Sequence, residues 1–420
     1  MEIIEQHSTI FYVLAFAFGL YMCWGIGAND VANAMGTSVG SGAITVRQAL
    51  ILAAIMEFAG AYLAGGAVTA TISKGIIDGR LFEPAPHLLL FGMIGALLAA
   101  GIWLMIATMR GWPVSATHSI IGAVCGVGVA ALGFEAVNWD RMTEIVASWF
   151  ISPLLGGIVA WALTLSIRKL IFNTENPIAQ ARKWGPMYAF LVGWIVSLVT
   201  ITTGLRHVNI LLSDYQGQFL SVAIGGLMAI AARLMMNRIQ LDEMDDRDFH
   251  YASVEKLFIP LMVFTGAAMA FAHGSNDVAN GIGPLATVVQ IIETKSVSSE
   301  SAVTPFMLFI GGMGIVVGLA TYGYKVMATM GHRITELTPT RGYSATVAAS
   351  FVTVAASGMG LPVSTTHIAV GAVMGVGIAR GIGALDLRVI GGILLSWFIT
   401  VPVGAILAAI TFYILRAIFG

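Results

Sequence analysis

Two short stretches place carboxylates and amides inside otherwise apolar sequence. Residues 27–33 read Gly-Ala-Asn-Asp-Val-Ala-Asn, and residues 274–280 repeat the pattern as Gly-Ser-Asn-Asp-Val-Ala-Asn. Polar groups at membrane depth cost free energy unless a partner satisfies them, so they mark functional sites. Asp30 and Asp277 carry oxygens of the kind that hold hard cations. The duplication predicts one site built from two related halves.

A second pair of motifs carries hydroxyls and histidines. Pro-Val-Ser-Ala-Thr-His at 113–118 recurs as Pro-Val-Ser-Thr-Thr-His at 362–367. Proline followed by a serine cap is typical of a helix start, where exposed backbone amides attract anions. We expect up to four such starts to converge, each contributing about half a positive charge. They follow Asn29, Ser115, Asn276 and Ser364.

Composition indicates a protein that lies in a lipid bilayer. Hydrophobic residues make up 57% of the 420 residues, charged residues make up 10%, and the mean hydropathy is +0.87. A water-soluble domain of this composition would lack the polar surface to cover itself. The net charge of −1 and the lack of a basic patch argue against nucleic acid as a partner. We therefore predict an all-α polytopic membrane protein.

Twelve apolar segments predict about twelve transmembrane spans. The first and the eighth are about 35 residues long, well beyond the roughly 20 residues that a helix needs to cross. Each holds one Asn-Asp motif near its middle, so we expect a helix broken there, with an unwound turn lining a polar cavity. The segments lie near residues 8–42, 49–72, 87–109, 113–133, 144–167, 187–203, 217–235, 257–292, 303–327, 343–359, 363–380 and 388–415.

Collinear matches predict inverted-topology repeats. Besides the two motif pairs, Ser-Trp-Phe-Ile at 148–151 recurs at 396–399. The number of residues between the two copies is nearly the same in all three pairs. Six spans lie between the first and the eighth segment, and because this number is even, the two copies are predicted to be antiparallel. Three parts follow: an N-terminal repeat over 1–167, a middle insert of two spans and cytoplasmic loops over 168–254, and a C-terminal repeat over 255–420. Each repeat has about five spans.

Loop charges predict the orientation. If the N-terminus lies outside, thirteen Lys and Arg residues fall in or beside cytoplasmic loops, and six fall on the outer side of the membrane. The positive-inside rule therefore places both termini outside the cytoplasmic (plasma or inner) membrane. The acidic run at 242–248 is expected to be a solvated cytoplasmic loop.

Charge balance predicts coupled binding of an anion and cations. Away from the ends of the predicted spans, the only acidic residues are Asp30, Glu57 and Asp277, and no Lys or Arg lies at comparable depth. A doubly charged oxyanion beside two aspartates gives the site a total charge of about minus four, and helix ends offset at most about two of these charges. Cations must therefore enter with the anion, which is the thermodynamic basis of symport. Sodium, protons and divalent metals remain open at this point.

These motifs resemble the inorganic phosphate transporter family, which includes bacterial carriers and the eukaryotic sodium-phosphate symporters. The resemblance rests on residues 27–45 and 274–289 and on the paired PVSATHS and PVSTTH. It covers both halves, apart from the middle insert. It implies symport of inorganic phosphate by alternating access around a midplane site, and a homodimer. Thr45–Gln48 and Glu57 are more similar to the sodium-coupled branch, which favours sodium over a proton-coupled (metal-)phosphate symporter. Sodium would be a co-substrate, and no cofactor is implied.

The resemblance also implies roles for single residues. Amides and carboxylates of the two Asn-Asp motifs would bind sodium, and Glu57 is open between a cation role and a helix contact. The histidines after the two caps would contact the binding residues rather than the substrate itself. One departure is that eukaryotic symporters carry a glutamate on the helix corresponding to 343–359, where this chain has Thr346 and no acid. The cation ligands would be Asn29, Asp30, Asn276 and Asp277; the phosphate contacts would be Asn33, Ser115, Thr117, Asn280, Ser364, Thr365 and Thr366; the supporting histidines would be His118 and His367.

Other interpretations of the same residues stay open. The aspartates could be structural caps, and the asparagines, serines and threonines could be ordinary contacts between membrane helices. An intramembrane hydrolase could use Ser115 and His118, but inverted duplication serves no single reaction centre, so we predict no enzyme. A passive anion channel usually selects with basic rings rather than buried acids. Glycines four residues apart predict close helix packing; they are Gly122, Gly126, Gly371 and Gly375.

Overall fold

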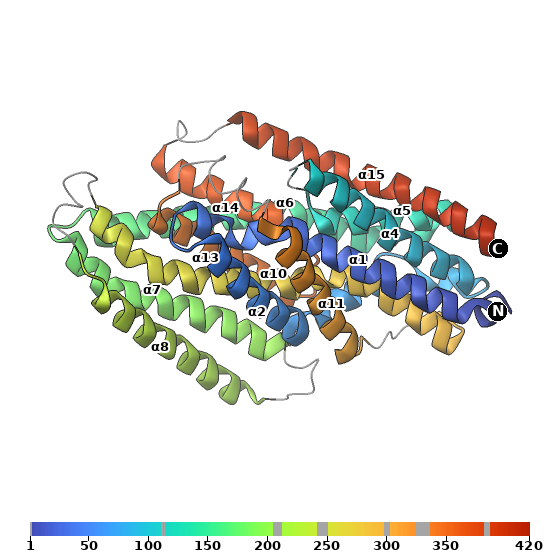
Figure 1. Ribbon diagram of the computed structural model, residues 1–420, viewed down its shortest axis with the longest axis horizontal. Helices are drawn as coiled ribbons and strands as arrows, with labels where there is room; N and C mark the ends of the chain where they lie inside the picture. Colours follow the sequence, from blue (N-terminus) through green and yellow to red (C-terminus); the bar gives the residue numbers. More distant parts are fainter. Residues whose placement is uncertain are drawn as a thin grey trace.

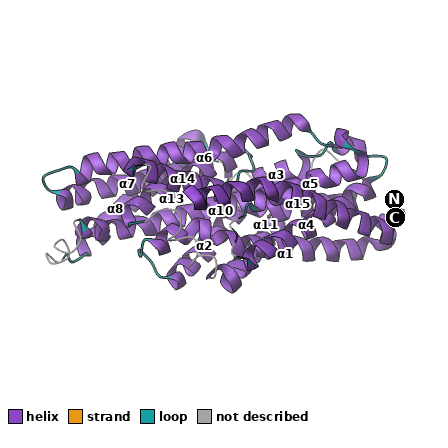
Figure 2. Cartoon of the chain, turned by 90° about the horizontal axis from the view of Figure 1, so that it is seen from above, coloured by secondary structure: helices purple, strands orange, loops and turns teal. Residues whose placement is uncertain are grey.

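A computed structural model describes residues 2–110, 112, 114–204, 212–241, 251–297, 303–324, 337–381 and 387–420. Within these ranges the chain is helical and contains no strand, apart from an isolated bridge between Ile77 and Val137. The helices form an elongated bundle with both termini at one end (Figures 1 and 2). The predicted all-α class is confirmed. Pro113 and the acidic run at 242–248 lie outside the described residues.

Each predicted apolar segment corresponds to a helix or a pair of helices. Nine helices in the described ranges are long and apolar enough to cross a membrane, so the count of twelve spans stays a prediction. The long helices are α1 (Glu2–Gly40), α2 (Val46–Ala64), α3 (Gly66–Lys74), α4 (Pro86–Met109), α5 (Ala116–Leu132), α6 (Trp139–Ile167), α7 (Pro177–Val199), α8 (Asp214–Arg238), α10 (Ala252–Thr294), α11 (Pro305–Gly318), α13 (Pro339–Gly358), α14 (Thr365–Arg380) and α15 (Leu387–Phe419). Short helical turns connect them: η1 (Gly79–Phe82), η2 (Phe134–Ala136), η3 (Arg168–Phe172), η4 (Thr200–Gly204) and η6 (Leu319–Gly323).

The two longest helices, α1 and α10, cross the molecule antiparallel to each other. Lys295, just after α10, pairs with Glu5 at the beginning of α1. At the other end, the Ser38 hydroxyl of α1 donates to the Met262 carbonyl of α10 at 3.5 Å. The two Asn-Asp motifs therefore approach the middle of the bundle from opposite directions.

Both helices run unbroken through their motifs, which corrects the prediction of a helix broken there. In α1 only His7, far from the motif, departs from helical backbone angles. The motif glycines serve close packing: a Cβ at Gly27 would lie 1.9 Å from the Ile315 carbonyl oxygen, and one at Gly274 would lie 2.1 Å from that of Glu57. The helices therefore offer side chains to the site while their own backbone hydrogen bonds stay intact.

Helical structure is interrupted instead before α5 and α14, which begin in the interior of the molecule. The Ser115 hydroxyl accepts from the His118 amide, and the Ser364 hydroxyl accepts from the His367 amide, each at 3.2 Å. Both serines are thus N-caps, as predicted. Of the four helix starts expected at the site, the two after Asn29 and Asn276 do not exist, because those residues lie inside α1 and α10.

Glycine contacts fix how these two short helices pack. A Cβ at Gly122 of α5 would lie 2.4 Å from the Val401 carbonyl oxygen of α15, and one at Gly371 of α14 would lie 2.2 Å from the Pro153 carbonyl oxygen of α6. Gly126 and Gly375, one turn further along, face α15 and α6 at similarly short range. The prediction that these glycines allow close helix packing is confirmed.

Candidate functional site

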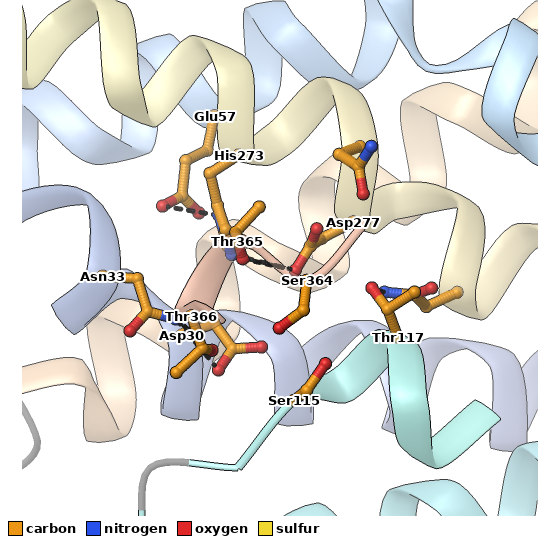
Figure 3. A network of polar contacts seen from close by, with 12 residues as sticks. Asp30, Asn33, Glu57, Ser115, Thr117, His273, Asp277, Ser364, Thr365 and Thr366 are labelled. Atoms are coloured by element: carbon orange, nitrogen blue, oxygen red, sulfur yellow. Dashed lines mark hydrogen bonds and ion pairs between the residues drawn. The ribbon is translucent and has the colours of Figure 1, made fainter. Parts of the chain in front are cut away.

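Four helices bring the predicted site residues into one buried cluster (Figure 3). The two unbroken helices contribute the Asn-Asp motifs, and the two interior helix starts contribute serine and threonine hydroxyls. None of the predicted cation or phosphate contacts is more than 6% exposed. The cluster is formed by Asp30 and Asn33 of α1, Asp277 and Asn280 of α10, Ser115 and Thr117 before and in α5, and Ser364, Thr365 and Thr366 before and in α14.

Two asparagines tie each long helix to a helix start from the other half of the sequence. The Asn33 amide donates to the Thr366 hydroxyl at 2.8 Å, and the Asn280 amide donates to the Thr117 hydroxyl at 3.2 Å. These threonines in turn donate to backbone carbonyls beside the opposite cap. Each half therefore positions the other half's helix start.

Each of these two threonine hydroxyls donates to a backbone carbonyl beside the other helix start. Thr117 donates to the Val363 carbonyl at 3.0 Å, and Thr366 donates to the Val114 carbonyl at 3.4 Å. Both contacts join the first turn of one short helix to the residue before the serine cap of the other. The starts of α5 and α14 are consequently held side by side, with their backbone amides available to an anion.

Several buried oxygens at the site accept no hydrogen bond in the part of the chain that the structure describes. Among the described residues, the Asn33 amide donates to Asp30 Oδ1 at 3.4 Å, and the Thr365 hydroxyl donates to Asp277 Oδ2 at 3.3 Å. Buried acceptors normally have a donor, so this group has the character of a cation-binding set. The oxygens without a donor include Asp30 Oδ2, Asp277 Oδ1, Asn276 Oδ1 and Asn280 Oδ1.

His273, which was not predicted as a site residue, lies among the acidic side chains. Its Nε2 is 3.3 Å from Asp277 Oδ2, and its Nδ1 is 3.2 Å from Glu57 Oε1. Ligand atoms of Asp30, His273 and Asp277 all lie within 4.8 Å of one another. Glu57 therefore reaches the site through the imidazole. One signal was available, because His273 precedes Asp277 by one helical turn and so shares its face.

The two remaining predicted cation ligands turn their amide nitrogens away from the aspartates. Asn29 donates to the Thr108 hydroxyl of α4 at 2.8 Å, and Asn276 donates to the Ser357 hydroxyl of α13 at 3.1 Å and to the Leu361 carbonyl at 3.3 Å. Thr108 and Ser357 were missed as site residues, although they are separated by the same offset as the two serine caps.

The two histidines after the caps lie behind the helix starts. The rings of His118 and His367 have centroids 4.2 Å apart, edge to face. His118 also contacts Trp149 at 3.8 Å between centroids, and His367 stacks on Trp397 at 3.4 Å. These rings contact each other and the tryptophans, which fits the predicted supporting position.

Comparison with known proteins agrees with this architecture. Residues 26–408 match the phosphate transporter family. The chain belongs to the phosphate transporter family. It is 48% identical over 421 residues to a protein of Haemophilus influenzae named "Putative phosphate permease", covering all of both chains. It is 39% identical to the chloroplastic inorganic phosphate transporter 2-1 of Arabidopsis thaliana, covering 96% of this chain and 71% of that protein.

A solved structure shares the fold of this phosphate transporter family member. It is named the sodium-dependent phosphate transporter, has 36% sequence identity and a TM-score of 0.89, and the match covers 97% of this chain and all of the other. The chain is therefore an integral membrane protein of a family that transports phosphate, which is a transport function rather than an enzymatic one.

Proposed function

We propose that this family member is a sodium-coupled phosphate symporter that binds both solutes in the Asp30–Asp277 cluster. The observation that carries the proposal is that Asp30 Oδ2 and Asp277 Oδ1 are buried without a hydrogen-bond donor from any described residue, beside two capped helix starts. Such an arrangement offers ligands for cations and donors for an oxyanion within one site. The name of the 36%-identical structure supports sodium as the cation.

Phosphate would bind at the starts of α5 and α14. The caps Ser115 and Ser364 leave the first backbone amides of both helices for substrate oxygens, and the half-charges of both helix ends favour an anion. Thr117, Thr365 and Thr366 add hydroxyls, and the amides of Asn33 and Asn280 complete the donor set. Inorganic phosphate has four oxygens to receive these groups.

Sodium would bind at the carboxylates of Asp30 and Asp277, with Asn29 and Asn276 as further oxygen ligands. Without cations, phosphate would face two buried carboxylates, so the two solutes promote each other's binding. We assign Glu57 to the imidazole of His273 rather than to sodium, because the histidine stands between Glu57 and Asp277.

The paired contacts support inverted-topology repeats and alternating access. In one bond an asparagine of the first half of the sequence, Asn33, donates to a threonine of the second half, Thr366; in the other, Asn280 of the second half donates to Thr117 of the first. The long helices α1 and α10 are also antiparallel. A site shared by two such repeats can open to either side when one repeat moves against the other. We further propose a homodimer in the cytoplasmic membrane with both termini outside, on the family resemblance and the loop charges.

A proton-coupled symporter is the second candidate, and one observation favours it. His273 is a buried imidazole between two carboxylates, which is an arrangement that can hold a transported proton. This candidate and the sodium symporter place phosphate at the same helix starts. They differ in which gradient drives uptake.

The deciding experiment measures labelled phosphate uptake into proteoliposomes with sodium and proton gradients imposed independently. Sodium symport predicts accumulation under a sodium gradient at equal pH on both sides. Accumulation under a proton gradient alone would favour the second candidate. Phosphate entry down its own gradient with no response to either ion would indicate a channel.

Substitution of a cap separates phosphate binding from cation binding. Ser364→Ala should weaken phosphate affinity more than sodium affinity, because the lost hydroxyl belongs to the proposed phosphate site. Ser213→Ala is a matched control, since Ser213 caps α8 through the Gln216 amide and lies outside the cluster. Equal losses of phosphate and sodium affinity in Ser364→Ala would show that this hydroxyl is only structural.

A further inference from the structure

The Asp30–Asp277 cluster contains a nitrogen ligand as well as oxygens. Nε2 of His273 lies 3.3 Å from Asp277 Oδ2, and ligand atoms of Asp30, His273 and Asp277 all lie within 4.8 Å of one another. All three side chains are buried, and they project from the middle of the two long helices, α1 and α10. One imidazole and two carboxylates form a ligand set that suits a divalent transition metal ion.

The imidazole separates such an ion from the hard cations. Calcium and magnesium are held by oxygen ligands, whereas zinc, iron, cobalt and nickel accept imidazole nitrogen together with carboxylate oxygen. Bonds of about 2.0–2.2 Å place two ligand atoms of one zinc ion up to about 4 Å apart. Side-chain shifts of under about 1 Å would therefore close the three ligand atoms around an ion.

Glu57 supplies the outer partner that a metal-bound histidine usually has. Its Oε1 lies 3.2 Å from Nδ1 of His273, and both side chains are fully buried. Figure 3 shows the imidazole with Glu57 on one side and Asp277 on the other. A ligating imidazole typically donates its second N–H to a carboxylate, which fixes the orientation of the ring and makes the ligating nitrogen more basic. Glu57 is placed to do this when Nε2 binds an ion.

The aspartates leave oxygens free for the same ion. Asp30 Oδ2 and Asp277 Oδ1 are buried and have no hydrogen-bond partner among the described residues, although buried acceptors normally have one. A single divalent ion would neutralise both carboxylates, which requires two sodium ions. Three protein ligands also leave a fourth position open, as in metal sites that exchange a ligand.

We propose that Asp30, His273 and Asp277 form a binding site for a divalent transition metal ion, which blocks transport by occupying the carboxylates that would hold sodium. The block rests on the proposed function, because it assumes sodium at the two aspartates. The metal site itself rests on the contacts of His273 alone.

Metal binding is tested by titrating purified full-length protein with Co²⁺ in choline chloride, without sodium or phosphate. The visible absorption of the bound ion reports its ligands. We expect one ion per chain and an affinity at least about 100-fold lower in His273→Asn, which loses a ligand. Glu57→Gln, which loses only the outer carboxylate, should bind about tenfold more weakly, at the low end of the range for such partners.

A histidine outside the cluster provides the matched control. His87 lies at the beginning of α4, is half-buried and contacts Phe91, so His87→Asn should bind Co²⁺ like the wild type. Thermal unfolding verifies that each variant is folded. Wild-type Co²⁺ affinity in both His273→Asn and Glu57→Gln would overturn the metal site. If His273→Asn does not fold, Glu57→Gln decides alone.

The block is tested in proteoliposomes with labelled phosphate and labelled Co²⁺. External Co²⁺ should slow sodium-driven phosphate uptake by the wild type and by His87→Asn, and additional sodium should relieve the inhibition. Entry of cobalt together with phosphate would overturn the block, because the ion would then be cargo. Uptake that is unaffected at Co²⁺ concentrations that saturate the purified protein would also overturn it. Failure of the proposed function looks different, because wild-type protein without metal would show no sodium-driven uptake while His273-dependent Co²⁺ binding persists.

Discussion

The α1 side and the α10 side of the central cluster share a framework and differ in charge. On both sides an asparagine reaches a threonine at the opposite helix start. Behind Asp277, however, stand His273 and Glu57, whereas the residue at the position of His273 on the α1 side is Ile26.

Glycine contacts identify the apolar counterpart of Glu57. Gly27 of α1 packs on the Ile315 carbonyl of α11, and Gly274 of α10 packs on the Glu57 carbonyl of α2. Ile315 therefore occupies the position on the α1 side that Glu57 occupies on the α10 side. Thr365, which donates to Asp277, likewise corresponds to Ala116. Duplication therefore supplies the framework of the proposed phosphate site, while the charged side chains that we propose to act in ion coupling are gathered beside α10.

The largest expected effect comes from the charged side. Asp277→Asn should lower sodium-driven phosphate uptake about 100-fold, because it removes a carboxylate from the proposed sodium site; a loss of about 3 kcal/mol in cation binding corresponds to about that factor. Asp30→Asn should lose less, since Asp30 has no ion-pair partner among the described residues. Uptake is measured in proteoliposomes with protein amount matched by gel. Wild-type rates and sodium dependence in Asp277→Asn would refute the comparison.

The buried Glu57–His273 pair should behave non-additively. Glu57→Ile alone leaves His273 without one of its two carboxylates and should lower stability by about 3 kcal/mol, as for other broken buried pairs. The double variant Glu57→Ile with His273→Ile copies the α1 side and should recover at least half of that loss. Thermal unfolding in detergent measures both. A double variant less stable than either single one would mean that the two sides are not equivalent in packing.

An added methyl group should lower stability equally at the α5–α15 contact and at the α14–α6 contact. Gly122→Ala and Gly371→Ala each place a Cβ within 2.4 Å of a neighbouring carbonyl oxygen and should destabilise by about 1–3 kcal/mol, the usual cost of overpacking. Gly226→Ala is the control, because a Cβ there meets nothing within 4 Å and alanine favours helix. A loss confined to one of the two crossings would contradict a shared framework.

The smallest expected effect concerns the asparagines. Asn33→Ala and Asn280→Ala each remove one hydrogen bond to a helix start, worth about 1 kcal/mol, so the phosphate KM should rise about fivefold in both. The measurement is the phosphate dependence of uptake at saturating sodium. An effect in one variant only would show that the helix starts of α5 and α14 do not share the substrate.

Much of the fold could be predicted because length and hydropathy determine where a membrane helix can lie. The twelve apolar segments match helices, and the constant offset between repeated motifs correctly brought Asp30, Asp277, Ser115 and Ser364 together. The unbroken course of α1 and α10 could not be foreseen. A glycine that packs against a neighbouring backbone, such as Gly27 or Gly274, looks the same in sequence as one in an unwound turn.

The composition of the site was harder to predict where a contact depends on distant packing. His273 pairs with Glu57 across more than 200 residues of sequence, and no spacing rule links α2 to α10. Residues repeated at a constant offset were predictable, and residues that break the repeat were not.

Sodium and phosphate, we propose, depend on each other for binding at the Asp30–Asp277 cluster. The most direct test of this dependence is titration of purified protein with phosphate, in saturating sodium and in choline of equal ionic strength, with pH held constant. We predict that sodium strengthens phosphate binding at least about tenfold, within the usual range of coupling between sites, and that phosphate strengthens sodium binding by the same factor. Equal phosphate affinity in sodium and choline would contradict it.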